Sequence, residues 1–338
     1  MKKINVQDAV GQALCHDVTA ITDGFKGALY KRGHVLTEED IPRLLDIGKK
    51  TVFVWEPDAG EVHEEDAALR FAAVNPVEGV SYEGPSEGKV VLRAKRRGML
   101  RVDTELQRRI NSIGDITVTS LPDHYPVEEN DRVASMRIVP LVTKEEQITE
   151  MEALCKERPL FRLLPYRQLK AGVIITGSEL YHGRITDRFE PVARKKLAAY
   201  PCEILGVEIC DDDLDMIAGA ARRFLSEGAL LLVFSGGMSV DPDDLTPGAI
   251  RSLGAEVVTQ GVPAQPGNMT LIAYLGEAAL VGVPSAAISS PATMFDVVLP
   301  QLFTGERFTK AELVNLGNGG LCQQCKSCHY PNCTYGKY

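Results

Sequence analysis

Apolar residues in the second half of the chain form short unbroken runs, each followed by glycine or polar positions. The clearest run, Leu230 to Phe234, ends in Ser-Gly-Gly, which predicts a strand that is buried on both faces and stops abruptly. Pro242 and Gly254 then bracket apolar residues with helical spacing, as in a helix opened by proline and closed by glycine. A glycine turn between a strand and a helix leaves main-chain N–H groups free, so we expect an anionic ligand here.

The alternation of strand and helix patterns extends from about Lys170 onward and predicts a doubly wound α/β domain with a parallel sheet. The predicted strands are 171–176, 202–210, 230–234, 256–259, 269–274 and 279–283, and the predicted helices are 190–199, 213–226, 247–253 and 286–299. Polar segments follow four of the strands, at 176–179, 211–213, 235–239 and 284–285. Because the carboxyl ends of parallel strands share one edge of a sheet, these segments should meet there.

Shorter patterns in the first half predict smaller α+β regions. Thr37-Glu38-Glu39-Asp40 resembles a capping box, and it opens a helix that Gly48 ends before a strand at 51–55. Further helices are predicted at 64–73 and 104–113, strands at 89–94, 115–119 and 135–141, and a helical period at 143–169. The predicted divisions are an α+β region at 1–75, a small α+β unit at 76–145, a linker at 146–169, the α/β domain at 170–310 and a Cys-rich tail at 311–338.

The charge balance narrows the possible partners. A formal net charge of −9 disfavours binding to nucleic acid or to an anionic membrane over the whole surface, and the basic run Arg93 to Arg97 is typical of a solvated face. The chain has no apolar stretch of the roughly 18 residues that a membrane helix needs. We therefore expect a cytoplasmic protein.

Three acidic residues follow the glycine turn at 236–237. Asp241, Asp243 and Asp244 would repel an anion unless they hold a cation, accept hydrogen bonds from a ring or face solvent. This mixture suits a ligand with both a phosphate and a polar heterocycle.

The eight cysteines fall into two groups. Four are isolated and are expected to be small buried apolar residues: Cys15, Cys155, Cys202 and Cys210. The other four have the spacing Cys-x2-Cys-x2-Cys-x4-Cys and are predicted to bind a metal: Cys322, Cys325, Cys328 and Cys333.

The chemistry of this tail stays open at the level of sequence. The spacing is compatible with tetrahedral zinc and is similar to the cysteine run of iron–sulfur proteins, although here Pro331 precedes the last cysteine instead of following it. His329 is an alternative ligand, and a disordered reactive tail is the alternative to any metal. The residues 317–320 predict a flexible hinge, so the tail could fold over its own domain or present its centre to a partner.

Several motifs in the second half of the chain, taken together, resemble those of a known family. They are Ile175 to Leu180, Gly183 to Asp187, Ser235 to Val240 with Asp244, Pro266-Gly267, and Gly282-Val283-Pro284. In this order they resemble the molybdopterin-binding domain of molybdopterin molybdotransferases, adenylyltransferases and gephyrin. The start of the chain is also similar to the amino-terminal part of the molybdotransferases, whereas their carboxyl-terminal β-rich domain is not evident.

The resemblance implies a ligand and a set of residues. The ligand is molybdopterin or its adenylated form, with Mg²⁺ or molybdate as accompanying ions. Asp187 and Asp244 would hold the pterin or a metal ion and are the candidate catalytic residues. The candidate cofactor-binding residues are Thr176, Gly177, Glu179, Asp187, Asp213, Ser235, Gly236, Gly237, Ser239, Asp244, Pro266, Gly267, Pro284 and Ser285.

The sequence also departs from the transferase pattern. The transferases usually have Asp-Ser-Asn where this chain has Asp187-Arg188-Phe189. They have Pro-Gly-Lys-Pro where it has Pro266-Gly267-Asn268-Met269, and Pro-Gly-Asn-Pro where it has Pro284-Ser285-Ala286-Ala287. These differences remove a positive charge, an amide and a glycine turn, each of which could bind a phosphate or an oxyanion.

Two function classes therefore remain open. The first is an enzyme that inserts molybdenum or tungsten while it hydrolyses an adenylate. The second is a carrier or sensor that holds molybdopterin for a partner molybdoenzyme or a cofactor-biosynthesis protein. An α/β domain that has lost its ligand is a third interpretation, and a homo-oligomer, with a dimer favoured, is expected in each case.

Overall fold

The computed structural model describes residues 1–54 and 58–337, so Trp55, the last residue of the predicted strand at 51–55, and Tyr338, the last of the predicted tail, lie outside the described part. The chain forms two compact units. The first contains Met1–Lys95, Val102–Ser120 and Asn130–Arg162, and the second contains Arg96–Arg101, Leu121–Glu129 and the chain from Leu163 onward. The predicted five-part division stays a prediction.

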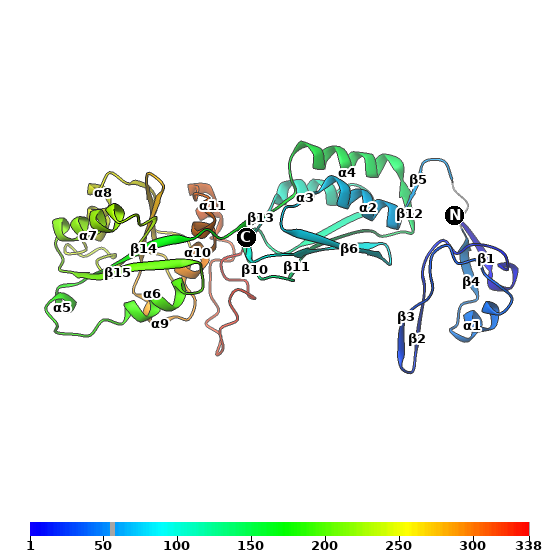
Figure 1. Cartoon of the computed structure of the whole chain (residues 1–338), viewed down its shortest axis with the longest axis horizontal. Helices are drawn as coiled ribbons and strands as arrows, with labels where there is room; N and C mark the ends of the chain where they lie inside the picture. The colour runs from blue at the N-terminus through cyan, green and yellow to red at the C-terminus, as the bar shows by residue number, and fades with distance from the viewer. Residues whose placement is uncertain (55–57, 338) are drawn as a thin grey trace. The chain divides into compact units, whose positions relative to one another are not determined.

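A six-stranded sheet with the order β15-β14-β16-β19-β18-β17 forms the centre of the second unit (Figure 1). Its strands are β14 (Leu169–Thr176), β15 (Cys202–Cys210), β16 (Leu231–Ser235), β17 (Glu256–Gln260), β18 (Leu271–Leu275) and β19 (Ala278–Val283). The first four in this order run parallel, but β18 is antiparallel to both of its neighbours. The prediction of a parallel sheet is therefore wrong at this edge, because the tight turn at Gly276 between β18 and β19 is too short for a parallel crossover.

Helices cover both faces of this sheet. They are α5 (Ser178–Tyr181), α6 (Phe189–Leu197), α7 (Leu214–Ser226), α8 (Thr246–Ser252), α9 (Ala286–Ser289), α10 (Met294–Thr304) and α11 (Lys310–Asn315). Alternate residues of the central strands supply two cores, with Ile174 and Phe234 packed in the cluster that holds residues of α7 and α8, and Val173 and Val233 in the cluster that holds residues of α6 and α10. The continuous apolar strands of the sequence thus reflect burial on both faces.

The helix predicted at 286–299 is wrong as one element. The structure divides it into α9 and α10, with Pro291 between them. Thr293 and Asp296 then form a capping box that starts α10. Proline ends the first helix and the reciprocal cap begins the second.

The first unit contains the antiparallel sheet β6-β7-β11-β9 and smaller strand pairs. Its strands are β1 (Lys2–Asn5), β2 (Val18–Thr22), β3 (Phe25–Tyr30), β4 (Thr51–Val54), β5 (Glu61–His63), β6 (Val80–Ser86), β7 (Lys89–Ala94), β9 (Ile116–Ser120), β11 (Arg132–Ile138) and β12 (Val142–Lys144). Its helices are η1 (Val6–Asp8, a 3₁₀ turn), α1 (Asp40–Asp46), α2 (Glu64–Val74), α3 (Thr104–Asn111) and α4 (Glu145–Glu157). A further sheet, most of whose residues belong to the second unit, has the order β10-β8-β13, with β8 at Gly98–Val102, β10 at Tyr125–Val127 and β13 at Phe161–Pro165.

Two local predictions for the first half need correction. The helix after Thr37 begins at Asp40, and its N-cap makes no side-chain hydrogen bond, because Thr37 donates its main-chain N–H and its hydroxyl to the Asp40 carboxylate in the preceding turn. The helical period at 143–169 is interrupted as well. Helix α4 ends at Glu157 and the chain continues into β13, since Pro159 cannot extend the helix.

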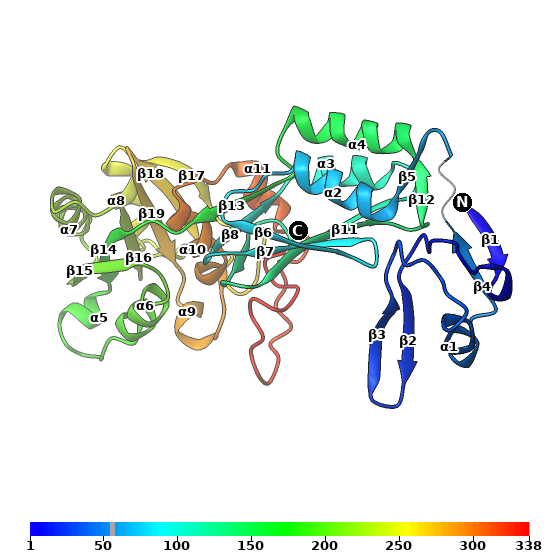
Figure 2. The ribbon, with the colours of Figure 1, turned by 45° about the vertical axis from the view of Figure 1, so that its right-hand side comes forward.

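The tail packs against the second unit, beside α10 (Figure 2). The ring of Tyr335 is 1% exposed and belongs to the larger core cluster. The Cys322 N–H donates to the Gln265 carbonyl at 2.8 Å, and the Gly336 N–H donates to the Gly319 carbonyl at 3.0 Å. The flexible hinge at 317–320 stays a prediction. A side chain at Gly320 would collide with main-chain oxygens of Leu316 and Pro263 at 2.4 and 2.5 Å.

None of the helices within residues 1–54 and 58–337 combines the length and the apolar character that a membrane span requires.

Candidate functional site

Four parallel strands of the second unit end side by side. The register pairs Thr176 with Cys210, Ile175 with Ser235, and Ser235 with Val283. The polar segments that follow these strands therefore start along one edge of the sheet. They are Gly177-Ser178-Glu179, Asp211-Asp212-Asp213, Gly236-Gly237-Met238-Ser239 and Pro284-Ser285.

The glycine turn after β16 lies directly against the end of β14. Gly236 has φ +93° and Gly237 has φ +54°, a region that residues with side chains rarely adopt. A Cβ atom on Gly236 would stand 2.0 Å from the Thr176 carbonyl oxygen, so only glycine fits. The two main chains approach this closely because glycine has no side chain.

Thr246 joins the same constellation, although the sequence pattern does not single it out. Its hydroxyl donates to the Gly236 carbonyl at 2.8 Å and lies 3.2 Å from the Thr176 hydroxyl. Both threonines are buried. The signal in the sequence is the Thr246-Pro247 pair at the start of α8, where proline favours the first helical turn.

Met238, which follows the two glycines, packs the turn against β19. Its side chain is 5% exposed and covers Gly282 of β19, where a Cβ atom would stand 2.3 Å from the Met238 methyl carbon. Ser239, the next residue, is exposed. The loop is thus anchored by an apolar side chain while its polar residue faces solvent.

The acidic candidates bind main-chain groups in this structure. The Asp187 carboxylate accepts the N–H groups of Phe189 at 2.9 Å and of Glu190 at 2.7 Å, at the start of α6. Asp213 caps α7 by accepting the Met216 N–H at 2.8 Å. Each carboxylate therefore has a structural role before any ligand is considered.

Two further acids order the loops themselves. Asp244 accepts the Asp241 N–H at 2.8 Å, and Asp212 accepts the Ser178 N–H at 2.9 Å. The second bond ties the segment after β14 to the segment after β15. Glu179 stands on α5 with an exposed side chain.

Pro266 and Gly267 lie close to α10 and to the tail. Gly267 has φ +112°, and a Cβ atom there would stand 2.9 Å from the Met294 nitrogen. The Pro266 carbonyl accepts a hydrogen bond from the Tyr335 hydroxyl. Pro284 and Ser285 lead into α9, and Ser285 is exposed.

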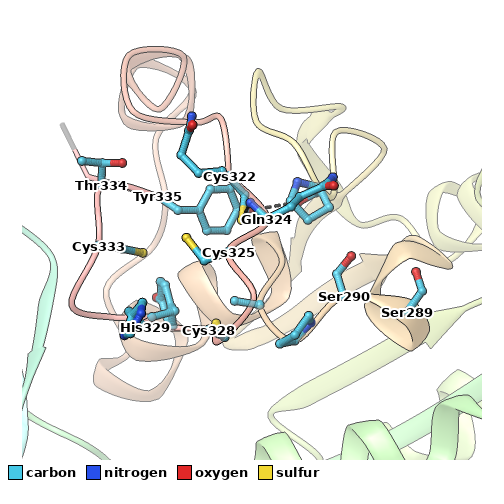
Figure 3. A pocket seen from close by; sticks show the side chains of 15 residues that line it. Ser289, Ser290, Cys322, Gln324, Cys325, Cys328, His329, Cys333, Thr334 and Tyr335 are labelled. Carbon is cyan, nitrogen blue, oxygen red and sulfur yellow. Dashed lines mark hydrogen bonds between the residues drawn. The ribbon is translucent and has the colours of Figure 1, made fainter.

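A cavity of about 420 Å³ lies between the tail and the segment that follows α9 (Figure 3). Its lining includes all four cysteines of the tail together with His329, Pro266, Ser289 and Ser290. Within residues 1–54 and 58–337, no three His, Cys, Asp or Glu side chains are grouped closely enough to hold one metal ion. The structure therefore brings the predicted tail ligands to one cavity without arranging them around a single point.

The four remaining cysteines lie elsewhere in the fold. Cys15, Cys155 and Cys210 are buried and Cys202 is partly buried. Burial raises the pKa of the Cys15, Cys202 and Cys210 thiols to about 11. These thiols are protonated and unreactive at neutral pH.

Comparison with known proteins identifies the second unit. Residues 172–304 match a family described as "Probable molybdopterin binding domain". The chain carries a molybdopterin-binding domain. The family takes part in molybdenum cofactor biosynthesis. Residues 3–56 match a separate family, described as "Domain of unknown function (DUF8806)".

Relatives of the molybdopterin-binding domain cover only parts of this chain. A molybdopterin molybdenumtransferase of Synechococcus elongatus is 29% identical over 147 residues, which are 41% of this chain and 36% of that protein. A CinA-like protein of a Mycobacterium species is 36% identical over 90 residues, which are 26% of this chain and 21% of that protein. The chain thus spans roughly a fifth to a third of the length of these relatives.

Solved structures with a similar domain include the molybdopterin biosynthesis enzyme MoaB of Thermus thermophilus. It is 20% identical with a TM-score of 0.33, and the match covers 42% of this chain and 99% of that chain. The molybdopterin biosynthesis MoeA protein of Pyrococcus horikoshii is 15% identical with a TM-score of 0.33, and the match covers 90% of this chain and 75% of that chain.

Proposed function

We propose that this chain binds molybdopterin, or its adenylated form, at the edge where β14, β15, β16 and β19 end, and that it does so in the biosynthesis or delivery of the molybdenum cofactor. The observation that carries the proposal is the glycine turn at Gly236 and Gly237. At Gly236 the turn packs against Thr176 with no room for a side chain, and both glycines have positive φ. A glycine turn of this kind between a strand and a helix is typical of main-chain phosphate sites.

The residues divide by the part of the ligand that each would contact. Main-chain groups of Ser235 to Gly237, with the exposed Ser239 hydroxyl, would bind the terminal phosphate. Acidic side chains would accept hydrogen bonds from the N–H groups of the pterin or would hold Mg²⁺. The proposed set is Thr176, Gly177, Glu179, Asp187, Asp213, Ser235, Gly236, Gly237, Ser239, Asp244, Pro266, Gly267, Pro284 and Ser285.

The test is a calorimetric titration with molybdopterin under argon. Gly237→Val places a branched side chain at φ +54°, with its Cβ 3.0 Å from the Thr246 hydroxyl, and we expect affinity to fall roughly tenfold or more, which is about 1.4 kcal/mol. Ser239→Ala removes an exposed hydroxyl without disturbing the core and should weaken binding to a smaller extent. Gly219→Ala on α7 is the matched control, because its Cβ would meet nothing within 4 Å.

Equal affinity of wild type, Gly237→Val and Ser239→Ala would overturn the proposed site. Thermal unfolding of each variant separates a loss of affinity from a loss of fold.

A second candidate function is the insertion of molybdate with hydrolysis of an adenylate, with Asp187 and Asp244 as the residues nearest the chemistry. The similarity of 147 residues to a molybdopterin molybdenumtransferase supports it. Asn268, Ser285 and Ala286 stand where that family has a lysine, a glycine and an amide, so turnover should be weak: loss of one oxyanion donor commonly costs about 10²–10³ in rate. Adenylate hydrolysis at the rate of a full molybdotransferase would favour this enzyme over the carrier.

A further inference from the structure

The tail presents four thiols to one cavity. Cys322, Cys325, Cys328 and Cys333 all line this space of about 420 Å³ (Figure 3). The segment between the first and last cysteine is polar and forms no helix or strand. Hydrophobic packing therefore does not explain the positions of the two exposed thiols, Cys325 and Cys328.

One main-chain and one side-chain hydrogen bond attach this loop to the rest of the second unit. The Cys322 N–H binds the Gln265 carbonyl at 2.8 Å, and the Tyr330 hydroxyl donates to the Asp296 carbonyl at 3.1 Å. Cys322 and Cys333 pack against the larger core cluster, whereas Cys325 and Cys328 are exposed on the turn between them. Two thiols are thus held in place, and two lie on a turn that can adjust to a bound group.

Local geometry near the first thiol is typical of a metal-binding loop. Gln324 has φ +50°, unusual for a residue with a side chain, and its N–H donates to the Cys322 sulfur at 3.4 Å. Such N–H groups stabilise a thiolate and tune a cluster that it ligates. The strained conformation aims the donor at the sulfur.

The size of the space favours the larger of the two centres that the spacing allows. One zinc ion would hold four sulfurs at about 2.3 Å from the metal, whereas the four thiols here line a cavity of about 420 Å³. An iron–sulfur cluster carries its own sulfides and irons between the thiolates and needs a cavity among them. We propose that Cys322, Cys325, Cys328 and Cys333 ligate one iron–sulfur cluster in this cavity.

The cluster would border the proposed molybdopterin site. The same cavity is lined by Pro266 and by Ser289 and Ser290, which follow the Pro284-Ser285 segment through α9. This part of the inference rests on the proposed function. It predicts that loading the cluster changes molybdopterin affinity, because Pro266 would contact both groups.

The test uses the full chain produced with added iron and purified without air. We expect iron and acid-labile sulfide in equal amounts, with a brown absorption that Cys325→Ser and Cys328→Ser each reduce severalfold. Both positions are exposed, so the fold should survive. The controls are Ser327→Ala in the same turn and Cys202→Ser in β15, and both should keep the full iron content.

Zinc without iron, or four freely titrating thiols without metal, would overturn the cluster. Equal iron content in Cys325→Ser and wild type would do so as well. Titration of cluster-loaded and cluster-free protein with molybdopterin is a separate measurement. A bound cluster without molybdopterin affinity would reject the proposed function and leave the cluster standing.

Discussion

The glycine turn of the sheet edge and the cysteine cavity of the tail are built by opposite means. At the turn, main-chain atoms of Gly236 and Thr176 pack so closely that no side chain fits between them. In the cavity, side chains supply the lining and no regular element holds the thiols. The first region is complete without a ligand, whereas the second has space that a bound group would fill.

The two regions are held in position by different contacts. The position of the turn is set by parallel strands, which pack between two hydrophobic cores. The tail obtains its position from a few anchors, above all the buried ring of Tyr335. The two regions should therefore respond to different substitutions.

The largest effect is expected from Tyr335→Ala. Removing this fully buried ring should lower the free energy of unfolding by about 3–5 kcal/mol and raise the reactivity of the tail thiols, while the strand edge keeps its register. Tyr335→Phe keeps the ring and loses only the hydrogen bond to the Pro266 carbonyl, at a cost of about 1 kcal/mol. Denaturant unfolding with a thiol-reactive probe measures both quantities, and equal effects of the two variants would contradict the role of the ring.

Gly236→Ala should disrupt the edge and spare the cavity. The φ of +93° and the 2.0 Å approach to the Thr176 oxygen predict a loss of about 2–3 kcal/mol in unfolding free energy. Gly219→Ala lies in the helix α7 with open space around it and should instead stabilise by about 0.5–1 kcal/mol. A Gly236→Ala protein as stable as wild type would show that the turn can move.

Acid should weaken the segment that leads into the tail. Burial opposes the charge of Glu312, but hydrogen bonds from His124 and Thr309 outweigh it and lower the pKa of this carboxyl from 4.5 to about 2. A lowered pKa contributes stability that is present above pH 4.5 and is lost as the pH falls toward 2. Glu312→Gln should remove this part of the pH dependence of unfolding, whereas Glu277→Gln on the exposed β18–β19 turn should preserve it; identical pH profiles for Glu312→Gln and wild type would reject the assignment.

The smallest effect is expected from Asp213→Ala, which removes the cap of α7 at the sheet edge. The free energy of unfolding should fall by about 1 kcal/mol. Asp215→Ala, two residues further along in the first turn of the same helix, is the comparison variant. If Asp213 also contacts molybdopterin, its substitution will lower affinity beyond the effect of Asp215→Ala.

Much of the sheet edge could be predicted from the sequence. The strand predicted at 202–210 coincides with β15, and the polar residues after each strand follow from chain order. The hydrogen bond from Thr246 to the Gly236 carbonyl could not be predicted, because it depends on the path of the loop 236–245. The direction of β18 was missed because it depends on one tight turn rather than on hydrophobic period.

The tail was harder to predict for a physical reason. Its composition is polar and suggests a free segment, yet four of its aromatic or sulfur-bearing residues pack on the core: Cys322, Tyr330, Cys333 and Tyr335. Single buried rings leave no periodic signal in a sequence. The cysteine spacing was visible, but the cavity that unites the four thiols was not.

The core of the second unit extends past the limits of its family match, and this bears on how the domain can be transplanted. Residues 172–304 carry the molybdopterin-binding match, but Leu169, Phe308, Leu313 and Tyr335 complete the same core. A gene fragment cut at the family limits would expose the apolar surface that these side chains cover. A fragment intended for fusion or recombination therefore has to include the segments on both sides of residues 172–304.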